Sequence, residues 1–448
     1  MITNNKNMIS RRTFLGSSIA LTGGVLLNPL SAGASAYVSG NDTLKIALIG
    51  CGARGTGAVR DAIQTEGPVE LVAMADVFRD KIESSYEILM RMDQVKDHIN
   101  VPEEHKFVGL NGYEKAIELA DVVLLVTPPA FRPVHFEASV RAGKHVFMEK
   151  PLACDAPGVR KILASGKLAE EKGLKVVVGL QNRYRYQTQA FVDRIQQGDI
   201  GDLTSARVQY LIGDITLIPR EEHQTELEYQ LRNWRHFSWL WGGSPAGLTI
   251  HYTDIANWVK EAHPIRAFGT GGRSVFSGPD RGNIFDNFYI EYAYADGTLL
   301  HSTTRHVPGG WLNRGYYFQG TKGAANNHAG RADSDGAHIT NLQGDVVWRY
   351  ENRDDPSAFQ VEHDVFFKAI REDTPHNDTE WGAHSTMTDI MGRMAVHSGH
   401  LIEWDEALNS KVKLVPDNLT TLDSEAPVLP KKDGNYPIPR PGSRSGIV

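Results

Sequence analysis

Lys150 and His251 are the two residues of this sequence whose side chains best suit the handling of a hydroxyl proton. Lys150 follows a predicted strand in "KHVFMEKP", and Pro151 biases the lysine away from helix, so its side chain can project from the end of that strand. There its ammonium group would stabilise an alkoxide that develops as hydride leaves. An imidazole titrates in the range in which it can accept the hydroxyl proton. The alternatives are a lysine in a surface loop and a structural histidine.

The stretch "HYTDIANWV" around His251 reads as a helix. It places His251, Asp254 and Trp258 on one face, because residues three and four apart are neighbours on a helix. Asp254 could orient the imidazole as a third catalytic residue, or it could only support the helix. The sequence leaves both roles open.

A glycine-rich turn, "GCGARG", follows a short apolar run of strand type and precedes a helical run. Gly50, Gly52 and Gly55 fit G-x-G-x-x-G, in which the first glycine makes the turn, the second lets a pyrophosphate approach and the third packs helix on strand. Asp76 ends the next predicted strand, near the spacing at which an acid meets the ribose hydroxyls of a dinucleotide, although it could instead cap a helix. Because an acid there repels a 2′-phosphate, the sequence predicts NAD rather than NADP.

The elements around these residues predict two domains of different type. Strand-like and helical runs alternate over residues 44–181, which predicts a doubly wound parallel sheet, an NAD-binding Rossmann domain over 41–181. Asp296-Gly297 lies between two alternating runs and predicts a hairpin within an α+β domain over 182–405 that has a large, mostly antiparallel sheet. Residues 406–448 are rich in proline and predict an extended arm.

Composition excludes several classes of function. The chain has 448 residues and a formal net charge of −7, without a long run of Lys or Arg, so nucleic acid and anionic membrane surfaces are poor partners. Its two cysteines, Cys51 and Cys154, show neither a disulfide framework nor zinc spacing, so we expect buried thiols and no metal site.

The N-terminus, residues 1–36, predicts an export signal. Arg11 and Arg12 stand in S-R-R-x-F-L order before a weakly apolar stretch and an A-x-A cleavage site, the pattern of a twin-arginine signal. The stretch is too short and too polar to span a membrane. This route carries folded proteins, so we expect the twin-arginine machinery as a partner, a periplasmic location and an NAD(H) that stays bound through turnover.

The motifs together resemble those of glucose–fructose oxidoreductases, inositol dehydrogenases and their relatives, the Gfo/Idh/MocA family. The likeness spans residues 44 to about 405 and includes "TPP", "AGKHV", "EKP" and the H-x-x-D of His251 and Asp254. It implies a Rossmann domain followed by a large open sheet, a homo-oligomer, and a lysine, Lys150, beside the nicotinamide. The cofactor-binding residues that follow from the motifs and the resemblance are Gly50, Gly52, Ala53, Arg54, Gly55, Asp76, Thr127, Pro128, Glu149, Lys150 and Gln181.

The sequence departs from the family pattern at two positions. Many relatives carry a carboxylate four residues before the histidine that matches His251, and here that position is Gly247. A histidine that is common near Arg132 is also absent, although His135 lies one turn later. Either another acid substitutes, or the chemistry is not plain alcohol oxidation.

Two segments supply candidate substrate residues. In "LRNWRHFSWLWGG", Trp234, Phe237 and Trp241 have helical spacing and form either a core stripe or, with His236 and Arg232 reaching hydroxyls, a stacking platform for a sugar. At the domain boundary, Arg183, Tyr184 and Tyr186 could line the cleft or belong to a polar linker. The predicted substrate contacts are Arg183, Tyr184, Trp234, His236 and His251.

Three functions are compatible with these residues. The first is an exported oxidoreductase whose tightly bound NAD(H) exchanges hydride with a carbohydrate, glycoside or polyol, a second substrate closing the cycle. The second is an NAD-dependent glycosidase that oxidises the sugar transiently and eliminates the aglycone. The third is a non-catalytic carbohydrate-binding relative, which Lys150 and His251 disfavour.

Overall fold

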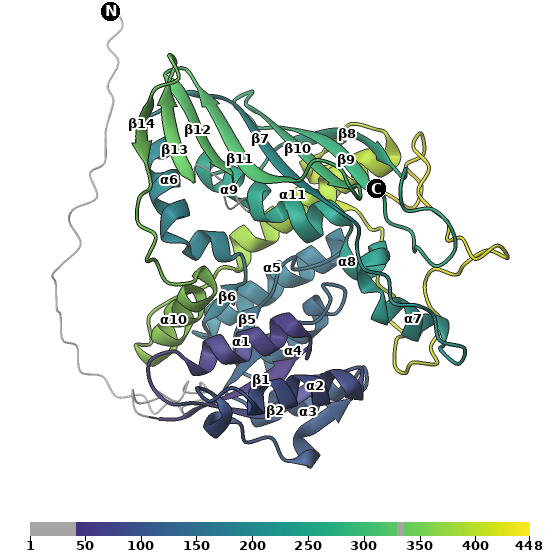
Figure 1. Ribbon diagram of the computed structural model, residues 1–448. Helices are drawn as coiled ribbons and strands as arrows, with labels where there is room; N and C mark the ends of the chain where they lie inside the picture. Colours follow the sequence, from purple (N-terminus) through teal and green to yellow (C-terminus); the bar gives the residue numbers. More distant parts are fainter. Residues whose placement is uncertain (1–41, 329–335) are drawn as a thin grey trace, which may run out of the picture. The chain divides into compact units, whose positions relative to one another are not determined.

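The computed structural model describes residues 42–328 and 336–448, and these form one compact unit (Figure 1). The predicted export signal, residues 1–36, lies outside the described residues. Among the residues described, no helix is both long enough and apolar enough to cross a membrane.

The N-terminal half contains a six-stranded, entirely parallel sheet in the order β3-β2-β1-β4-β5-β6. Its interior strands are buried on both faces, which explains their continuous apolar sequences. The strands are β1 (Leu44–Ile49), β2 (Val69–Asp76), β3 (Lys106–Val108), β4 (Val122–Leu125), β5 (His145–Met148) and β6 (Val176–Val178).

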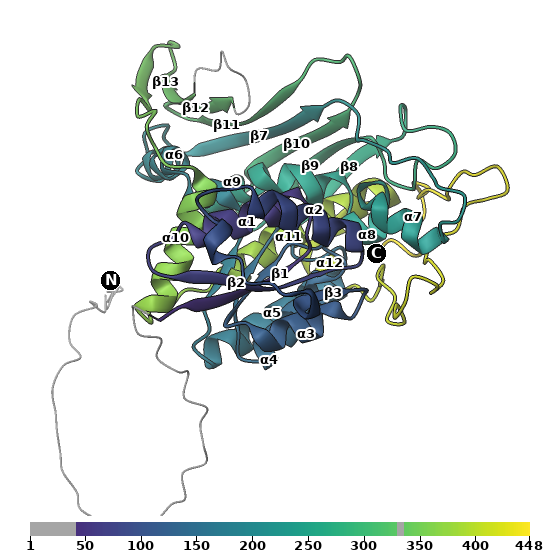
Figure 2. The ribbon, with the colours of Figure 1, turned by 60° about the horizontal axis from the view of Figure 1, so that its bottom comes forward.

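Alternate residues of β1 contact helices on opposite faces of this sheet. Leu44, Ile46 and Leu48 belong to one apolar cluster with α1, α2 and α10, whereas Ala47 and Ile49 belong to another with α3, α4 and α5. Figure 2 shows α1 and α2 on one side of β1 and β2, and α3, α4 and α5 on the other. The helices are α1 (Ala53–Ile63), α2 (Arg79–Met90), α3 (Gly112–Leu119), α4 (Arg132–Arg141), α5 (Ala156–Glu171) and α10 (Ala358–Arg371).

A nine-stranded sheet in the order β14-β13-β12-β11-β7-β10-β9-β8-β15 forms the second half. Only β7 and β10 pair in parallel, so the sheet is mostly antiparallel, and the predicted fold class is confirmed. The hairpin at Asp296-Gly297 connects β9 to β10. The strands are β7 (Leu203–Ile212), β8 (Arg266–Gly272), β9 (Asn287–Ala293), β10 (Leu299–His306), β11 (Asn313–Gly320), β12 (Gly323–His328), β13 (Ala337–Asn341), β14 (Val346–Arg349) and β15 (Ile402–Glu403).

Three helices, α6 (Tyr186–Gln196), α9 (Ile250–Lys260) and α11 (Thr379–Ser398), pack against one face of the second sheet. One apolar cluster runs from the parallel sheet through α5 and α11 to this face, so both sheets share a core. This shared core places the start of α9 beside the parallel strands' C-terminal ends.

The last residues, 411–448, contain no helix or strand and pack as an extended segment. Tyr436 and Ala426 belong to an apolar cluster with Tyr229 and Phe237, near α7 (Glu226–Arg232) and α8 (Ser238–Trp241). The hydroxyl of Tyr436 donates to Glu226 at 2.5 Å. The segment thus supports the part of the chain that carries Trp234.

Candidate active site

A cleft of about 560 Å³ opens at the C-terminal edge of the parallel sheet. Its walls come from the turns after β1, β2, β4 and β5, joined by residues 231–235 and by the start of α9. The strand order reverses between β1 and β4, with α1 and α4 on opposite faces, and ligands of doubly wound sheets bind at such a switch point. All eleven residues predicted to bind the cofactor line this cleft.

The glycine turn has the shape that a pyrophosphate requires. Gly50 has a φ of +101°, and a Cβ on it would lie 2.6 Å from the Thr127 nitrogen; a Cβ on Gly55 would lie 2.1 Å from the Gly50 carbonyl oxygen. A Cβ on Gly52 would meet nothing within 4 Å, so this glycine faces open space in the cleft. α1 begins at the next residue, and no side chain caps its N-terminus. Its first N–H groups are therefore available to phosphate oxygens, and the residues fit a dinucleotide.

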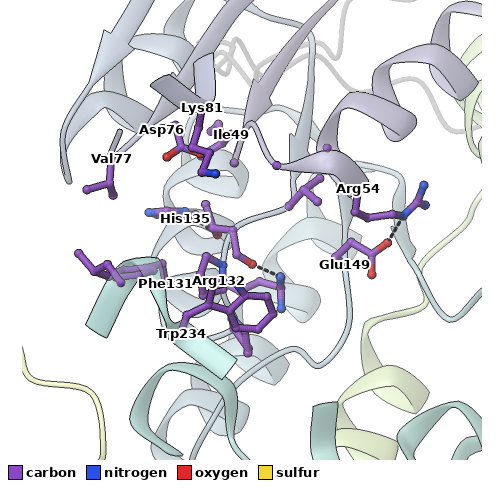
Figure 3. A pocket seen from close by; sticks show the side chains of 18 of the residues that line it. Ile49, Arg54, Asp76, Val77, Lys81, Phe131, Arg132, His135, Glu149 and Trp234 are labelled. Atoms are coloured by element: carbon purple, nitrogen blue, oxygen red, sulfur yellow. Dashed lines mark hydrogen bonds and ion pairs between the residues drawn. The ribbon is translucent and has the colours of Figure 1, made fainter. Parts of the chain in front are cut away.

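Asp76 lines the cleft, and its carboxylate accepts two backbone N–H groups there. One carboxylate oxygen accepts the Phe78 N–H at 3.0 Å, at the start of α2, and the other accepts the Cys51 N–H at 2.8 Å. Burial raises the pKa of Asp76 despite these two donors. Figure 3 shows Asp76 and Lys81 together on one side of the cleft, away from Trp234.

Cys51 and Cys154 are both buried free thiols, as expected.

The buried guanidinium of Arg132 connects two turns of the cleft by donating to the carbonyl oxygens of Thr127 and Pro151. His135, one turn later in α4, packs on the ring of Tyr113 with a centroid distance of 4.1 Å. Burial lowers the pKa of His135 to about 3, so its imidazole is neutral. These residues shape the cleft wall and hold no mobile proton at neutral pH.

Glu149 and Arg54 form an ion pair at 2.5 Å that crosses the edge of the sheet (Figure 3). Arg54 also contacts Glu362 of α10 at 2.7 Å. The sequence analysis missed Glu362, because nothing local marks a residue that α10 brings to α1 from 308 positions away. The pairing satisfies the charge of Arg54 within the protein.

Lys150 and His251 both line the cleft, and we call the part that carries them the reacting end. The Nζ of Lys150 donates to the carbonyl oxygen of Gly247 at 2.8 Å. Burial lowers the pKa of Lys150 to about 8; Arg235 and Arg132 act in the same direction, and Glu149 opposes them. The amine is thus poised to exchange a proton near neutral pH.

The position of the missing family acid, Gly247, has no room for a side chain. A Cβ there would lie 2.1 Å from the indole of Trp241, which is buried. Gly247 belongs to a π-helical turn, Pro245–Thr249, directly before α9. This chain therefore replaces a carboxylate beside Lys150 by a backbone carbonyl.

His251 lines the same cleft from the first turn of α9. Its Nδ1 is buried without a hydrogen-bond partner, whereas Nε2 has no partner among the described residues and is not buried. Burial lowers the pKa of His251 well below its ordinary value, and the positive charge of Lys150 adds to this effect. The imidazole is neutral and presents Nε2 to the cleft.

Asp254 does not line the cleft, and its contacts favour the helix-supporting role over the catalytic one. Arg183 donates to its two carboxylate oxygens, both at 2.9 Å, and the Ser385 hydroxyl donates at 2.7 Å. Asp254 is fully buried and makes no hydrogen bond to His251. The same ion pair removes Arg183 from the cleft, contrary to its prediction as a substrate contact.

Two further predicted substrate contacts also do not line the cleft, because core packing uses their polar groups. The hydroxyl of Tyr184 donates to Asp378, and the imidazole of His236 is fully buried with Nε2 3.2 Å from the Thr216 carbonyl oxygen. Trp234 does line the cleft, beside Arg235, which the sequence analysis did not select. Trp241 and Phe237 belong to the core stripe.

Comparison with known proteins agrees with this geometry. Residues 44–180 match the model of the Gfo/Idh/MocA oxidoreductase family, described as having an NAD-binding Rossmann fold. An inositol 2-dehydrogenase of Rhizobium meliloti is 24% identical over 286 residues, 63% of this chain and 74% of the relative. A glycosyl hydrolase family 109 protein of Porphyromonas gingivalis is 26% identical over 175 residues, 38% of this chain and 35% of that protein.

Among solved structures, an aldose-aldose oxidoreductase of Caulobacter crescentus complexed with glycerol has a TM-score of 0.64 and 17% identity. It covers 81% of this chain and 100% of its own. This likeness extends over both sheets and supports the two-domain fold.

Proposed function

We propose that this chain, whose residues 44–180 match the model of the Gfo/Idh/MocA oxidoreductase family, transfers hydride to or from a carbinol of a carbohydrate or polyol. The observation that carries the proposal is the cleft itself. It brings the glycine turn, Lys150 and His251 to one edge of one sheet. The similarity to an inositol 2-dehydrogenase supports a polyhydroxylated substrate.

A nicotinamide in this cleft supplies the hydride acceptor or donor, and the protein handles the proton. The neutral amine of Lys150 accepts the hydroxyl proton, and the resulting ammonium hydrogen-bonds the substrate oxygen. The Gly247 carbonyl, 2.8 Å from Nζ, fixes where the amine stands. An ammonium has three N–H donors, so the contact to Gly247 leaves others for the substrate.

His251 has a different task from the one that the sequence suggested. Its burial and the neighbouring cation Lys150 oppose an imidazolium, so it is a weak proton acceptor. Its accessible Nε2 can still form a hydrogen bond with a substrate hydroxyl and orient the carbinol. Lys150 is thus the proton-transferring residue, and His251 positions the substrate.

Export, a permanently bound cofactor and a homo-oligomer also belong to this proposal. Export rests on the S-R-R-x-F-L order and the A-x-A site within residues 1–36. An exported enzyme has no supply of free NAD, so the hydride must return to a second substrate while the cofactor remains bound. The family resemblance supports the homo-oligomer.

An NAD-dependent glycosidase is the second candidate, favoured by the similarity to a glycosyl hydrolase family 109 protein. In that reaction, oxidation of a ring carbinol acidifies the neighbouring C–H bond, and loss of that proton expels the aglycone with its bonding electrons. Water then adds to the double bond, and the stored hydride returns to the ketone. The products balance as hydrolysis without net redox change.

The test begins with the purified full chain. We expect denaturation after extensive dialysis to release close to one NAD(H) per chain, identified by mass spectrometry and absorbance at 340 nm. Candidate sugars and glycosides are then tested for a change in the absorbance at 340 nm and for release of aglycone. A change in this absorbance with net oxidation or reduction of the sugar supports the dehydrogenase. Release of aglycone without net redox change supports the glycosidase. A chain that binds no NAD(H) refutes both.

A further inference from the structure

We propose that the substrate carries a negative group, a carboxylate or a phosphate, that pairs with Arg235 at the rim of the cleft. The inference rests on the proposed function and names the substrate class for the same site. It starts from the charges that line the cleft, which are six cationic side chains and two acidic ones: Arg54, Lys81, Arg132, Lys150, Arg232 and Arg235 against Asp76 and Glu149.

Three of these arginines already have protein partners. Arg54 pairs with Glu149 and Glu362, at 2.5 and 2.7 Å. Arg232 pairs with Glu228 at 3.2 Å and with Asp80 at 3.3 Å, and the guanidinium of Arg132 donates to two backbone carbonyl oxygens. Their groups serve the architecture of the cleft rather than a ligand.

Arg235 differs from them. It is exposed and forms no ion pair or hydrogen bond through its side chain with any described residue. Its guanidinium carbon lies 5.2 Å from the ring centroid of Trp234, which lines the cleft with it. Arg235 lines the same cleft as Lys150, and it is one of the charges that lower the pKa of Lys150. A free guanidinium fork beside an aromatic ring suits a sugar that bears a carboxylate or phosphate.

Two further cations influence the charge state of His251. Arg185 and Arg314 act with Lys150 in lowering the pKa of His251. Both are exposed, neither forms an ion pair within the described ranges, and Arg314 lies over the ring of Tyr210 at 5.1 Å. Cationic side chains outnumber acidic ones along the cleft, and this excess of positive charge attracts an anionic substrate.

The test compares matched sugars on the full chain with its NAD(H). The probes are glucose as the neutral sugar, glucuronate as the carboxylate and glucose 6-phosphate as the phosphate, scored by the 340 nm band. We expect an anionic probe to have the higher kcat/KM, and its preference over glucose to fall about tenfold in Arg235→Gln, mainly through KM. Arg235→Lys keeps part of the preference, and Arg91→Gln, an exposed arginine paired with Glu87 in α2, leaves it unchanged.

The two anionic probes separate a carboxylate site from a phosphate site. The inference is overturned if glucose has a kcat/KM equal to or higher than that of both anions. It is also overturned if Arg235→Gln lowers kcat/KM equally for glucose and for both anions. The proposed function stands in either case. If no sugar, neutral or anionic, changes the band of an NAD(H)-loaded chain, the proposed function fails and the inference with it.

Discussion

Replacing Gly247 by alanine tests whether a backbone carbonyl has taken the place of an acid beside Lys150. The added methyl group would lie 2.1 Å from the buried indole of Trp241. Non-bonded carbon atoms pack at about 3.5–4.0 Å, so the indole or the Gly247 carbonyl must move by about 1 Å or more. Overpacking of this kind costs about 1–3 kcal/mol of the free energy of unfolding.

A displacement of Trp241 or of the Gly247 carbonyl would also disturb two contacts at the cleft. The Gly247 carbonyl accepts the hydrogen bond of Lys150, and Trp241 packs edge-on against Trp234 of the cleft at 6.3 Å. A misplacement of about 1 Å at a catalytic group lowers the rate by up to about 100-fold. We therefore expect Gly247→Ala to lose both stability and kcat/KM.

Urea unfolding and steady-state kinetics measure the two effects. Gly272→Ala is the matched control, because a Cβ there would meet nothing within 4 Å. Trp241→Leu removes the clashing indole atoms. The double variant should therefore lose about 0.5–3 kcal/mol less free energy of unfolding than the two single variants lose together. If Gly247→Ala equals the unchanged protein in both measurements, our account of this position is refuted.

The remaining predictions concern the proton and the buried ion pair. For alcohol oxidation Lys150 must first lose its proton, so kcat/KM should rise with pH through a midpoint near 8, the value to which burial lowers its pKa. Lys150→Arg, which cannot lose the proton, should abolish that rise and lower kcat/KM by about 100-fold or more, and an unchanged pH profile would contradict this role. Asp254→Asn should cost about 3 kcal/mol of unfolding free energy, because Arg183 loses its buried partner, without moving the pH midpoint. A lower kcat at full stability would instead make Asp254 a positioning residue for His251.

Much of the cofactor half could be predicted from the sequence because its determinants are local. The glycine turn needs specific residues within six positions, and the parallel strands are continuous apolar runs because helices cover both faces. Lys150 could be identified for the same reason, since Pro151 and the strand before it define where it stands. All eleven predicted cofactor residues come together in one cleft.

The second half could not be read in the same way, because its polar residues acquire their roles from distant partners. Arg183 and Asp254 are 71 positions apart, and nothing local in the sequence indicates the ion pair that joins them. His236 and Trp234 have similar sequence surroundings, but His236 is buried in the core and Trp234 lines the cleft. Packing separates them, because distant elements surround one side chain and leave the other at the cleft surface.

The cofactor turn, the two kinds of sheet and the lysine at the strand end follow from local sequence, because each depends on residues near one another in the chain. The contact that holds this lysine depends on residues that the fold brings together from distant positions. A glycine carbonyl supports Lys150 because the indole of Trp241 fills the space that an acid would need. Nor does any local pattern mark Arg235 as the cleft-lining arginine whose side chain has no ion-pair or hydrogen-bond partner among the described residues, because ion pairing depends on which carboxylates the fold brings within reach.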